Sequence, residues 1–260
     1  MKFERLLIEA SLKAGEEILK IYAQDFDVET KADESPLTQA DKNAHLAIVS
    51  VLEQIGLPIL SEEGKHMDFA ERKNWKQFWL VDPLDGTKEF VKKNGEFTVN
   101  IALIEDGLPV YGIIYAPVLK KLFVGNVGHE AWIAENVEPD SSIESILDRK
   151  IAIPKTKSAE PYIVVASRSH FSAETQEFVD ELKKEKGEID FTSMGSSLKI
   201  CLVAEGVADI YPRFGPTMEW DTGAGHAIAK AAGKMVVDHT TGEEMRYNKE
   251  NLLNNWFIVS

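Results

Sequence analysis

The chain has 260 residues, of which 43 are Asp or Glu and 29 are Lys or Arg, so its formal net charge is -14. Such a charge repels polyanions, which excludes DNA and RNA as the main ligands. One cysteine, Cys201, rules out an internal disulfide and a four-thiolate metal site. We therefore expect a cytoplasmic protein, because there is also no signal-peptide core and no apolar run near the ~20 residues that span a bilayer.

Two helices are predicted at the start of the chain. Apolar residues recur every three or four positions over residues 2–23, which predicts an amphipathic helix, and a polar loop follows over 26–38. A second helix is expected from Asp41 to residue 55, before Gly56 and Pro58. Asp41 then lies in a first turn, where the helix dipole favours a negative charge, so capping competes with a functional role.

Two apolar segments each end in acidic residues. Residues 59–60 lead into Glu62 and Glu63, a pair that an exposed turn also explains, and residues 65–77 are polar and helix-like. Residues 78–81 are apolar without interruption, as expected of a strand buried on both faces. Asp82 and Asp85 follow at its carboxyl end, where open α/β sheets bind ligands. We expect these two carboxylates to line a site.

The rest of the chain divides into two patterns. Short apolar runs separated by Gly and Pro predict an antiparallel meander, and then strands alternate with helices. The acidic, irregular residues 136–150 between the patterns predict an N-terminal α+β domain over 1–148 and a C-terminal α/β domain over 149–260. The meander strands are expected at 97–104, 110–115, 122–125 and 129–134. The later elements are expected at 162–166, 172–186, 189–193, 195–205, 208–211, 220–232 and 234–237.

The segment 82–87 carries the chemistry. Asp82 and Asp85 are three residues apart with Pro83 between them, so the two carboxylates can face one point. The N–H groups of Gly86 and Thr87 can bind an anion if a helix begins there. Carboxylates beside a phosphate need cations between them, and ligands made only of oxygen favour Mg²⁺. Zinc fits poorly, because the six histidines form no His-x-x-x-His pair.

Two other motifs are excluded. The segment LDGT at 84–87 resembles the phosphatase loop of haloacid dehalogenases, but Pro83 occupies the place of the aspartate that becomes phosphorylated. Proline cannot be phosphorylated, which favours water as the nucleophile. The Asp spacing of an EF-hand is absent.

Four short segments resemble, in order, the signature of the inositol monophosphatase superfamily of Mg²⁺-dependent, lithium-sensitive phosphatases. Taken by itself, Asp221 near the start of its predicted helix is explained by helix capping, but it is also part of the fourth segment. The segments are TQAD (38–41), SEE (61–63), DPLDGT (82–87) and EWDTGAG (219–225). Residues 85–90, 195–199 and 211–213 are most similar to the bacterial 3'(2'),5'-bisphosphate nucleotidase branch. The resemblance implies a layered α-β-α-β-α sandwich with an antiparallel N-terminal sheet and an α/β C-terminal part.

The resemblance also implies a role for individual residues. Two or three Mg²⁺ ions would be bound by Glu62, Asp82, Asp85, Asp221 and the carbonyl of Leu84, with Glu63 supporting one ion through water. Asp41 and Thr87 would orient and deprotonate the attacking water, and Gly86 and Thr87 would contact the phosphate. Ser196, Lys199 and Arg213 would bind the substrate, with His170 near its sugar or base. Surface exposure is the competing explanation for Lys199 and Arg213.

The expected reaction removes the 3'-phosphate of adenosine 3',5'-bisphosphate, giving AMP in a clearance step of sulfate assimilation. Lys88 favours this branch over inositol phosphatases. An inositol or sugar phosphatase of the same superfamily is the first alternative, and a non-enzymatic cation-binding protein is the second. The sequence does not fix the oligomeric state, and it leaves open a peripheral contact with the cytoplasmic face of the inner membrane.

Overall fold

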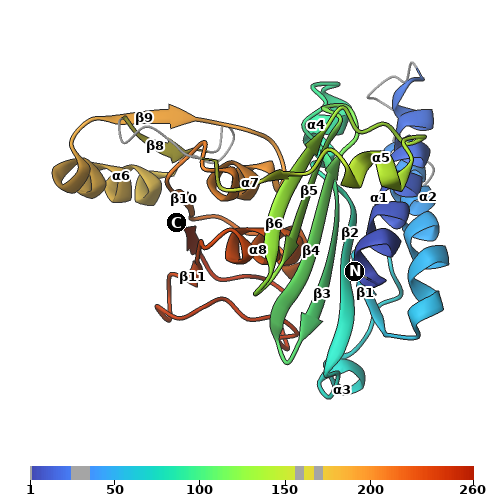
Figure 1. Cartoon of the computed structure of the whole chain (residues 1–260). Helices are drawn as coiled ribbons and strands as arrows, with labels where there is room; N and C mark the ends of the chain where they lie inside the picture. The colour runs from blue at the N-terminus through green and yellow to red at the C-terminus, as the bar shows by residue number, and fades with distance from the viewer. Residues whose placement is uncertain (1, 25–35, 156–160, 167–171) are drawn as a thin grey trace.

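The computed structural model describes residues 2–24, 36–155, 161–166 and 172–260. In this part of the chain, the elements stack as a helical layer, a large sheet, a second helical layer, smaller sheets and an outer helix (Figure 1). This order confirms the layered sandwich. None of the helices in the described ranges is both long enough and apolar enough to cross a bilayer.

The large sheet contains the expected meander. Its seven strands, counted over the described residues, follow the chain order from β1 to β7. Only the β1–β2 pair is parallel; the remaining pairs are antiparallel. The strands are β1 (Ile59–Ser61), β2 (Gln77–Asp85), β3 (Thr98–Glu105), β4 (Leu108–Ala116), β5 (Lys121–Asn126), β6 (Glu130–Glu135) and β7 (Ile151–Ala152).

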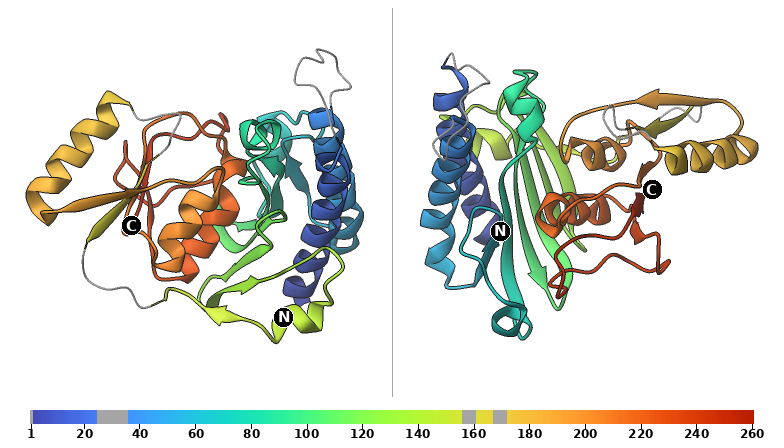
Figure 2. Two further views of the ribbon diagram at one scale, coloured as in Figure 1. Left: turned by 90° about the horizontal axis from the view of Figure 1, so that it is seen from above. Right: turned by 180° about the vertical axis from the view of Figure 1, so that it is seen from behind.

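Strand β2 is buried on both faces because helices cover both sides of the sheet. Helices α1 (Lys2–Tyr22) and α2 (Pro36–Leu52) lie on one face, and α8 (Glu219–Ala231) lies on the other (Figure 2). Successive side chains of a strand point to opposite faces. Trp79 therefore joins the core under α1 and α2, whereas Leu80 joins the core under α8. The uninterrupted apolar run of the sequence is explained by this double coverage.

Helix α8 approaches the sheet closely at two strand glycines. A Cβ added to Gly112 would lie 2.3 Å from the carbonyl oxygen of Ala224, and one added to Gly125 would lie 2.4 Å from the Cα of Ile228. No side chain fits in either gap. The glycines thus allow α8, which carries Asp221, to rest directly on the backbone of β4 and β5.

The outer layers complete the fold. Strand β12 (Phe257–Val259) lies between β10 (Tyr211–Arg213) and β11 (Val236–Asp238), and is antiparallel to both. Strands β8 (Tyr162–Val165) and β9 (Ile189–Thr192) form a parallel pair. The remaining helices are η1 (Glu53–Ile55), α3 (Phe69–Arg72), α4 (Thr87–Val91), α5 (Ile143–Leu147), α6 (Ala173–Lys186) and α7 (Leu198–Glu205). The division at residues 148 and 149 stays a prediction; β7 lies just beyond it and still pairs with β6.

Several expected element boundaries are wrong, among them those of β2, α2 and α3. Strand β2 continues to Asp85 instead of ending at residue 81, because the register with β3 shifts between Asp82 and Asp85. Such a bulge tolerates Pro83, which cannot donate to the ladder. Helix α2 already includes Pro36, a residue that suits a first helical turn. The helix expected within 65–77 covers only α3.

Candidate active site

Three segments bring acidic residues to the carboxyl end of β2. Asp82 continues the β2 face that packs under α8. Glu62 directly follows β1, and its backbone N–H donates to the carbonyl of Val81 at 3.2 Å. Asp221 lies in the first turn of α8, where its Oδ2 accepts from the N–H of Met218 at 2.9 Å. Asp221 therefore does cap its helix, and it does so with one of its two carboxylate oxygens.

The ionisation of these carboxyl groups shows that they form one electrostatic cluster. Burial raises the pKa of Asp82 well above its ordinary value, and the charges of Asp85, Glu62 and Asp221 raise it further. Burial and then Asp85 raise the pKa of Asp221 to about 7. The pKa of Glu62 is raised by partial burial of its carboxyl group and by Asp85. Each carboxylate thus makes its neighbours harder to ionise.

Asp41 belongs to the same cluster. It lies in the second turn of α2, so the capping explanation is wrong for this residue. The side chain is buried, and its Oδ1 has no hydrogen-bond partner. Burial raises the pKa of Asp41 to about 8, and the charges of Glu63 and Glu62 add to this effect. A buried carboxyl oxygen without a partner is rare, and it points to a missing ligand.

The donor set fits a hard divalent cation. The cluster offers carboxylate oxygens and carbonyl oxygens without sulfur or imidazole, which suits Mg²⁺. Within the described ranges, however, no three His, Cys, Asp or Glu side chains converge on one point as in a preformed metal cage. Carboxylates without a cation between them repel each other, and Mg²⁺ keeps several waters and uses few protein ligands. Spaced carboxylates are therefore compatible with such ions.

A buried polar network holds the other face of Asp85. Its Oδ2 accepts from the backbone N–H of Ser197 at 2.6 Å and faces the Asn100 amide at 3.4 Å. The Ser197 hydroxyl donates to Asn100 Oδ1 at 2.9 Å and lies 2.9 Å from the Thr98 hydroxyl. Sequence reasoning missed these residues as contributors to the site. The detectable signal was Asn100, a polar residue between the apolar Val99 and Ile101 of β3, opposite Asp82 in the β2–β3 register.

An open cavity adjoins the acids and contains most of the residues expected to bind substrate. Burial lowers the pKa of Lys199 to about 8, with Asp85 opposing the shift, so Lys199 is no ordinary surface cation. Arg213 is half-buried, and its Nε has no hydrogen-bond partner. His170 lies outside the described residues. The cavity is lined by Asp85, Gly86, Lys88, Ser196, Lys199, Arg213 and Asp221, among others.

The start of α4 forms one wall of this cavity. Gly86 precedes the helix with φ +99°, and a Cβ there would lie 3.2 Å from the Cβ of Ser196. Thr87, the first residue of α4, is exposed. Leu84 is buried, and its N–H donates to Asp82 Oδ1 at 3.1 Å. The segment 82–87 therefore adjoins both the acidic cluster and the cavity. Six predicted site residues in the described part of the chain do not line the cavity itself: Asp41, Glu62, Glu63, Asp82, Leu84 and Thr87.

Comparison with known proteins gives consistent results. A sequence model of the inositol monophosphatase family matches residues 2–256. The 3'(2'),5'-bisphosphate nucleotidase CysQ of Escherichia coli K12 is 46% identical over 252 residues, which cover 95% of each chain. The crystal structure of CysQ from Bacteroides thetaiotaomicron superposes with a TM-score of 0.93 at 51% identity, covering 100% of this chain and 97% of that one. An inositol monophosphatase from Zymomonas mobilis shares the fold, with a TM-score of 0.75 at 23% identity over 100% and 92% of the two chains.

Proposed function

The chain belongs to the inositol monophosphatase family, and from this premise we propose that it is a 3'(2'),5'-bisphosphate nucleotidase. The proposed reaction removes the 3'-phosphate of adenosine 3',5'-bisphosphate and gives AMP and phosphate. Two relatives at 46% and 51% identity carry the name CysQ, and the Escherichia coli protein is named as this nucleotidase. The use of a single cysteine, the free and buried Cys201, supports the further proposal that the protein works in the cytoplasm.

One observation carries the substrate proposal. The cavity is lined by two acids, Asp85 and Asp221, and by two cations, Lys199 and Arg213. A substrate with one phosphate is recognised only at the acids, where Mg²⁺ ions would bind between the carboxylates and the phosphate. A nucleotide with a second phosphate needs further positive charge, and Lys199 and Arg213 can supply it.

The residues divide the work as follows in this proposal. Glu62, Asp82, Asp85, Asp221 and the Leu84 carbonyl would hold two or three Mg²⁺ ions, and Glu63 would act through a bridging water. When bound, such ions polarise the phosphate and neutralise charge that develops in the transition state.

The remaining residues handle the water and the anion. Asp41 accepts a proton from the attacking water, and the Thr87 hydroxyl orients that water. The Asp41 carboxyl suits this role because it is buried and its Oδ1 has no hydrogen-bond partner, so that oxygen is free to accept the proton. The backbone of Gly86 and Thr87 contacts the transferred phosphate. Ser196, Lys199 and Arg213 hold the other end of the nucleotide.

The test compares specificity constants for phosphate release from three substrates with Mg²⁺: adenosine 3',5'-bisphosphate, adenosine 3'-phosphate and inositol 1-phosphate. We expect the bisphosphate to be preferred. Arg213→Met should lower its kcat/KM by about 10- to 100-fold, the value of a charge-assisted hydrogen bond, with little effect on adenosine 3'-phosphate. A preference for inositol 1-phosphate would reject the nucleotidase, and Mg²⁺ binding without turnover of any substrate would indicate a cation-binding protein.

A further inference from the structure

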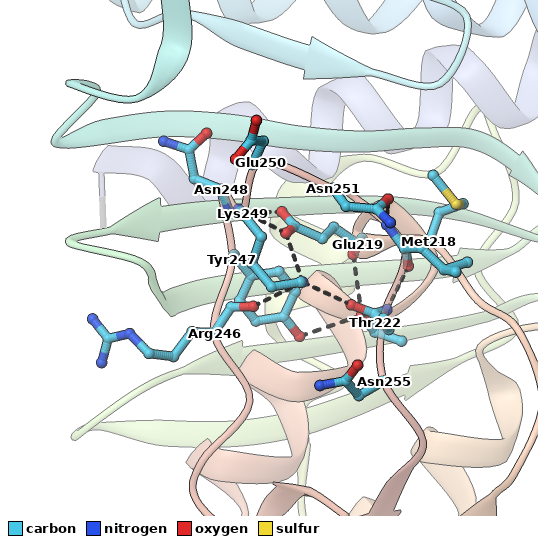
Figure 3. Close-up of polar contacts among 12 residues, drawn as sticks. Met218, Glu219, Thr222, Arg246, Tyr247, Asn248, Lys249, Glu250, Asn251 and Asn255 are labelled. Atoms are coloured by element: carbon cyan, nitrogen blue, oxygen red, sulfur yellow. Dashed lines mark hydrogen bonds and ion pairs between the residues drawn. The ribbon is translucent and has the colours of Figure 1, made fainter. Parts of the chain in front are cut away.

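The C-terminal segment 246–254 surrounds a buried carboxylate next to Asp221. Glu219, the first residue of α8, is 0% exposed. It accepts from the backbone N–H groups of Asn248 at 2.6 Å and Lys249 at 3.0 Å, and from Lys249 Nζ at 2.7 Å. Figure 3 shows Glu219 and Lys249 pointing toward each other across the gap between α8 and this segment.

Lys249 also reaches a second residue that holds the start of α8. Its Nζ donates to Asn254 Oδ1 at 3.2 Å. The Asn254 amide in turn donates to the carbonyl of Met218 at 2.8 Å and to Thr222 Oγ1 at 3.1 Å. Met218 and Thr222 flank Asp221 in the sequence, and the Met218 N–H is the donor to Asp221 Oδ2. The ammonium group of Lys249 therefore contacts both Glu219 and Asn254, the two side chains that fix the first turn of α8, which carries Asp221.

The segment is also fixed at its opposite side. Arg72, which is 2% exposed, donates to Asn248 Oδ1 at 2.9 Å, to the Lys249 carbonyl at 2.7 Å and to the Glu250 carbonyl at 2.9 Å. Arg72 ends α3, which follows the turn containing Glu62. The segment 246–254 thus joins the start of α8 to the end of α3.

We propose that Lys249 is a positioning residue for Asp221, and that it sets the affinity of the site for Mg²⁺ by fixing the first turn of α8. A fully buried carboxylate is strongly unfavourable without its partner. Without the Lys249 ammonium group, Glu219 keeps its two backbone N–H donors but loses its counter-charge, so it rotates toward water or draws water in, and either change moves the turn that carries Asp221. Partners that orient metal ligands typically contribute a factor of 10 to 100 in metal affinity. The inference rests on the proposed metal site.

The experiment measures Mg²⁺ binding by isothermal titration calorimetry without nucleotide. Lys249→Met removes the ammonium group and keeps the length of the side chain. Lys155→Met is a matched control, because Lys155 also pairs at 2.7 Å with a buried carboxylate, Glu205, whose side chain is 7% exposed. Neither Lys155 nor Glu205 contacts the acidic cluster through any hydrogen bond in the described part of the chain.

We expect Lys249→Met to weaken Mg²⁺ binding at least 10-fold and Lys155→Met to change it less than 2-fold. Lys249→Arg should restore part of the affinity, because a cation again faces Glu219. If Lys249→Met does not fold, Lys249→Gln takes its place, since it removes the positive charge that faces Glu219 and should therefore still weaken Mg²⁺ binding. Equal Mg²⁺ affinity in the wild type and the Lys249 variant would overturn the inference, as would an equal loss in the Lys155 control. A wild type that binds no Mg²⁺ would instead refute the metal site itself.

Discussion

The substitution Asp41→Asn should stabilise the metal-free protein and abolish its activity. Asp41 is buried without a partner for Oδ1, and burial raises its pKa from 3.8 to about 8. Between these values, the native carboxyl keeps its proton while the unfolded chain has lost it. Stability is therefore lost as the pH rises from about 4 to about 8. Asparagine has the same shape and no charge, so it removes this dependence.

The magnitude follows from proton linkage. Each pH unit between the two pKa values costs about 1.4 kcal/mol of unfolding free energy. The unfolding free energy of Asp41→Asn should therefore be higher than that of the wild type by about 4 kcal/mol at pH 7 and by about 6 kcal/mol at and above pH 8. This holds if the amide packs as the carboxyl group does. A stability gain at a residue needed for activity is the trade-off expected at a functional site.

The assay is urea denaturation in EDTA at several pH values between 5 and 9. Asp180→Asn serves as the control, because Asp180 is an exposed carboxylate of α6 that contacts Gln176 and Lys183 of its own helix. The difference between Asp41→Asn and wild type should grow with pH, whereas the Asp180 difference should stay below about 0.5 kcal/mol. A constant difference for Asp41 over pH 5–8 would refute the reasoning, because the carboxyl would then not be desolvated.

Three further predictions concern the metal, the network and the packing. Mg²⁺ at 100 times its Kd should raise the unfolding free energy by about 2.7 kcal/mol; an unchanged Tm in scanning calorimetry would contradict a shared metal site. Asn100→Ala removes the amide between Asp85 and Ser197, so kcat should fall about 10-fold, while urea denaturation should show a loss of about 1–3 kcal/mol. Gly125→Ala places a Cβ 2.4 Å from the Cα of Ile228 in α8, so urea denaturation should show a loss of about 1–3 kcal/mol in unfolding free energy. A variant as stable as the wild type would show that α8 can shift away from the sheet.

Local patterns predicted the acidic motifs because each motif is a short, continuous stretch of the chain. The apolar residues 78–81 indicate a strand that is covered on both faces. Its carboxyl end lies beside that of the parallel strand β1, where Asp82 and Glu62 can meet. The true length of β2 was not predictable in the same way. Pro83 normally ends a strand, and only the pairing with β3 shows that it occupies an irregular position in the ladder.

Contacts between distant parts of the chain were beyond the sequence. Glu219 and Lys249 each look like surface charges in a chain with many, and only the return of the C-terminal segment buries one against the other. Asn100 contacts Asp85 because of a strand register, and Ser197 contacts both because of a loop 97 residues later. Neither register nor loop placement is fixed by local preference, so the partners of Asp85 and Asp221 emerge only from the tertiary structure.

The close packing of α8 on the large sheet has a consequence for synthesis of the protein. The strands are complete once residue 152 has been made, but the helix that covers one of their faces ends at Ala231. Until then, Phe78, Leu80 and Phe123 lie on a face with no permanent cover. A nascent chain in this state exposes a broad apolar surface and is prone to aggregate or to recruit chaperones. A fragment that stops at residue 148 lacks α8 and keeps this apolar face exposed. In the full chain most of the acidic residues are made early, but they come together with Asp221 only when α8 docks.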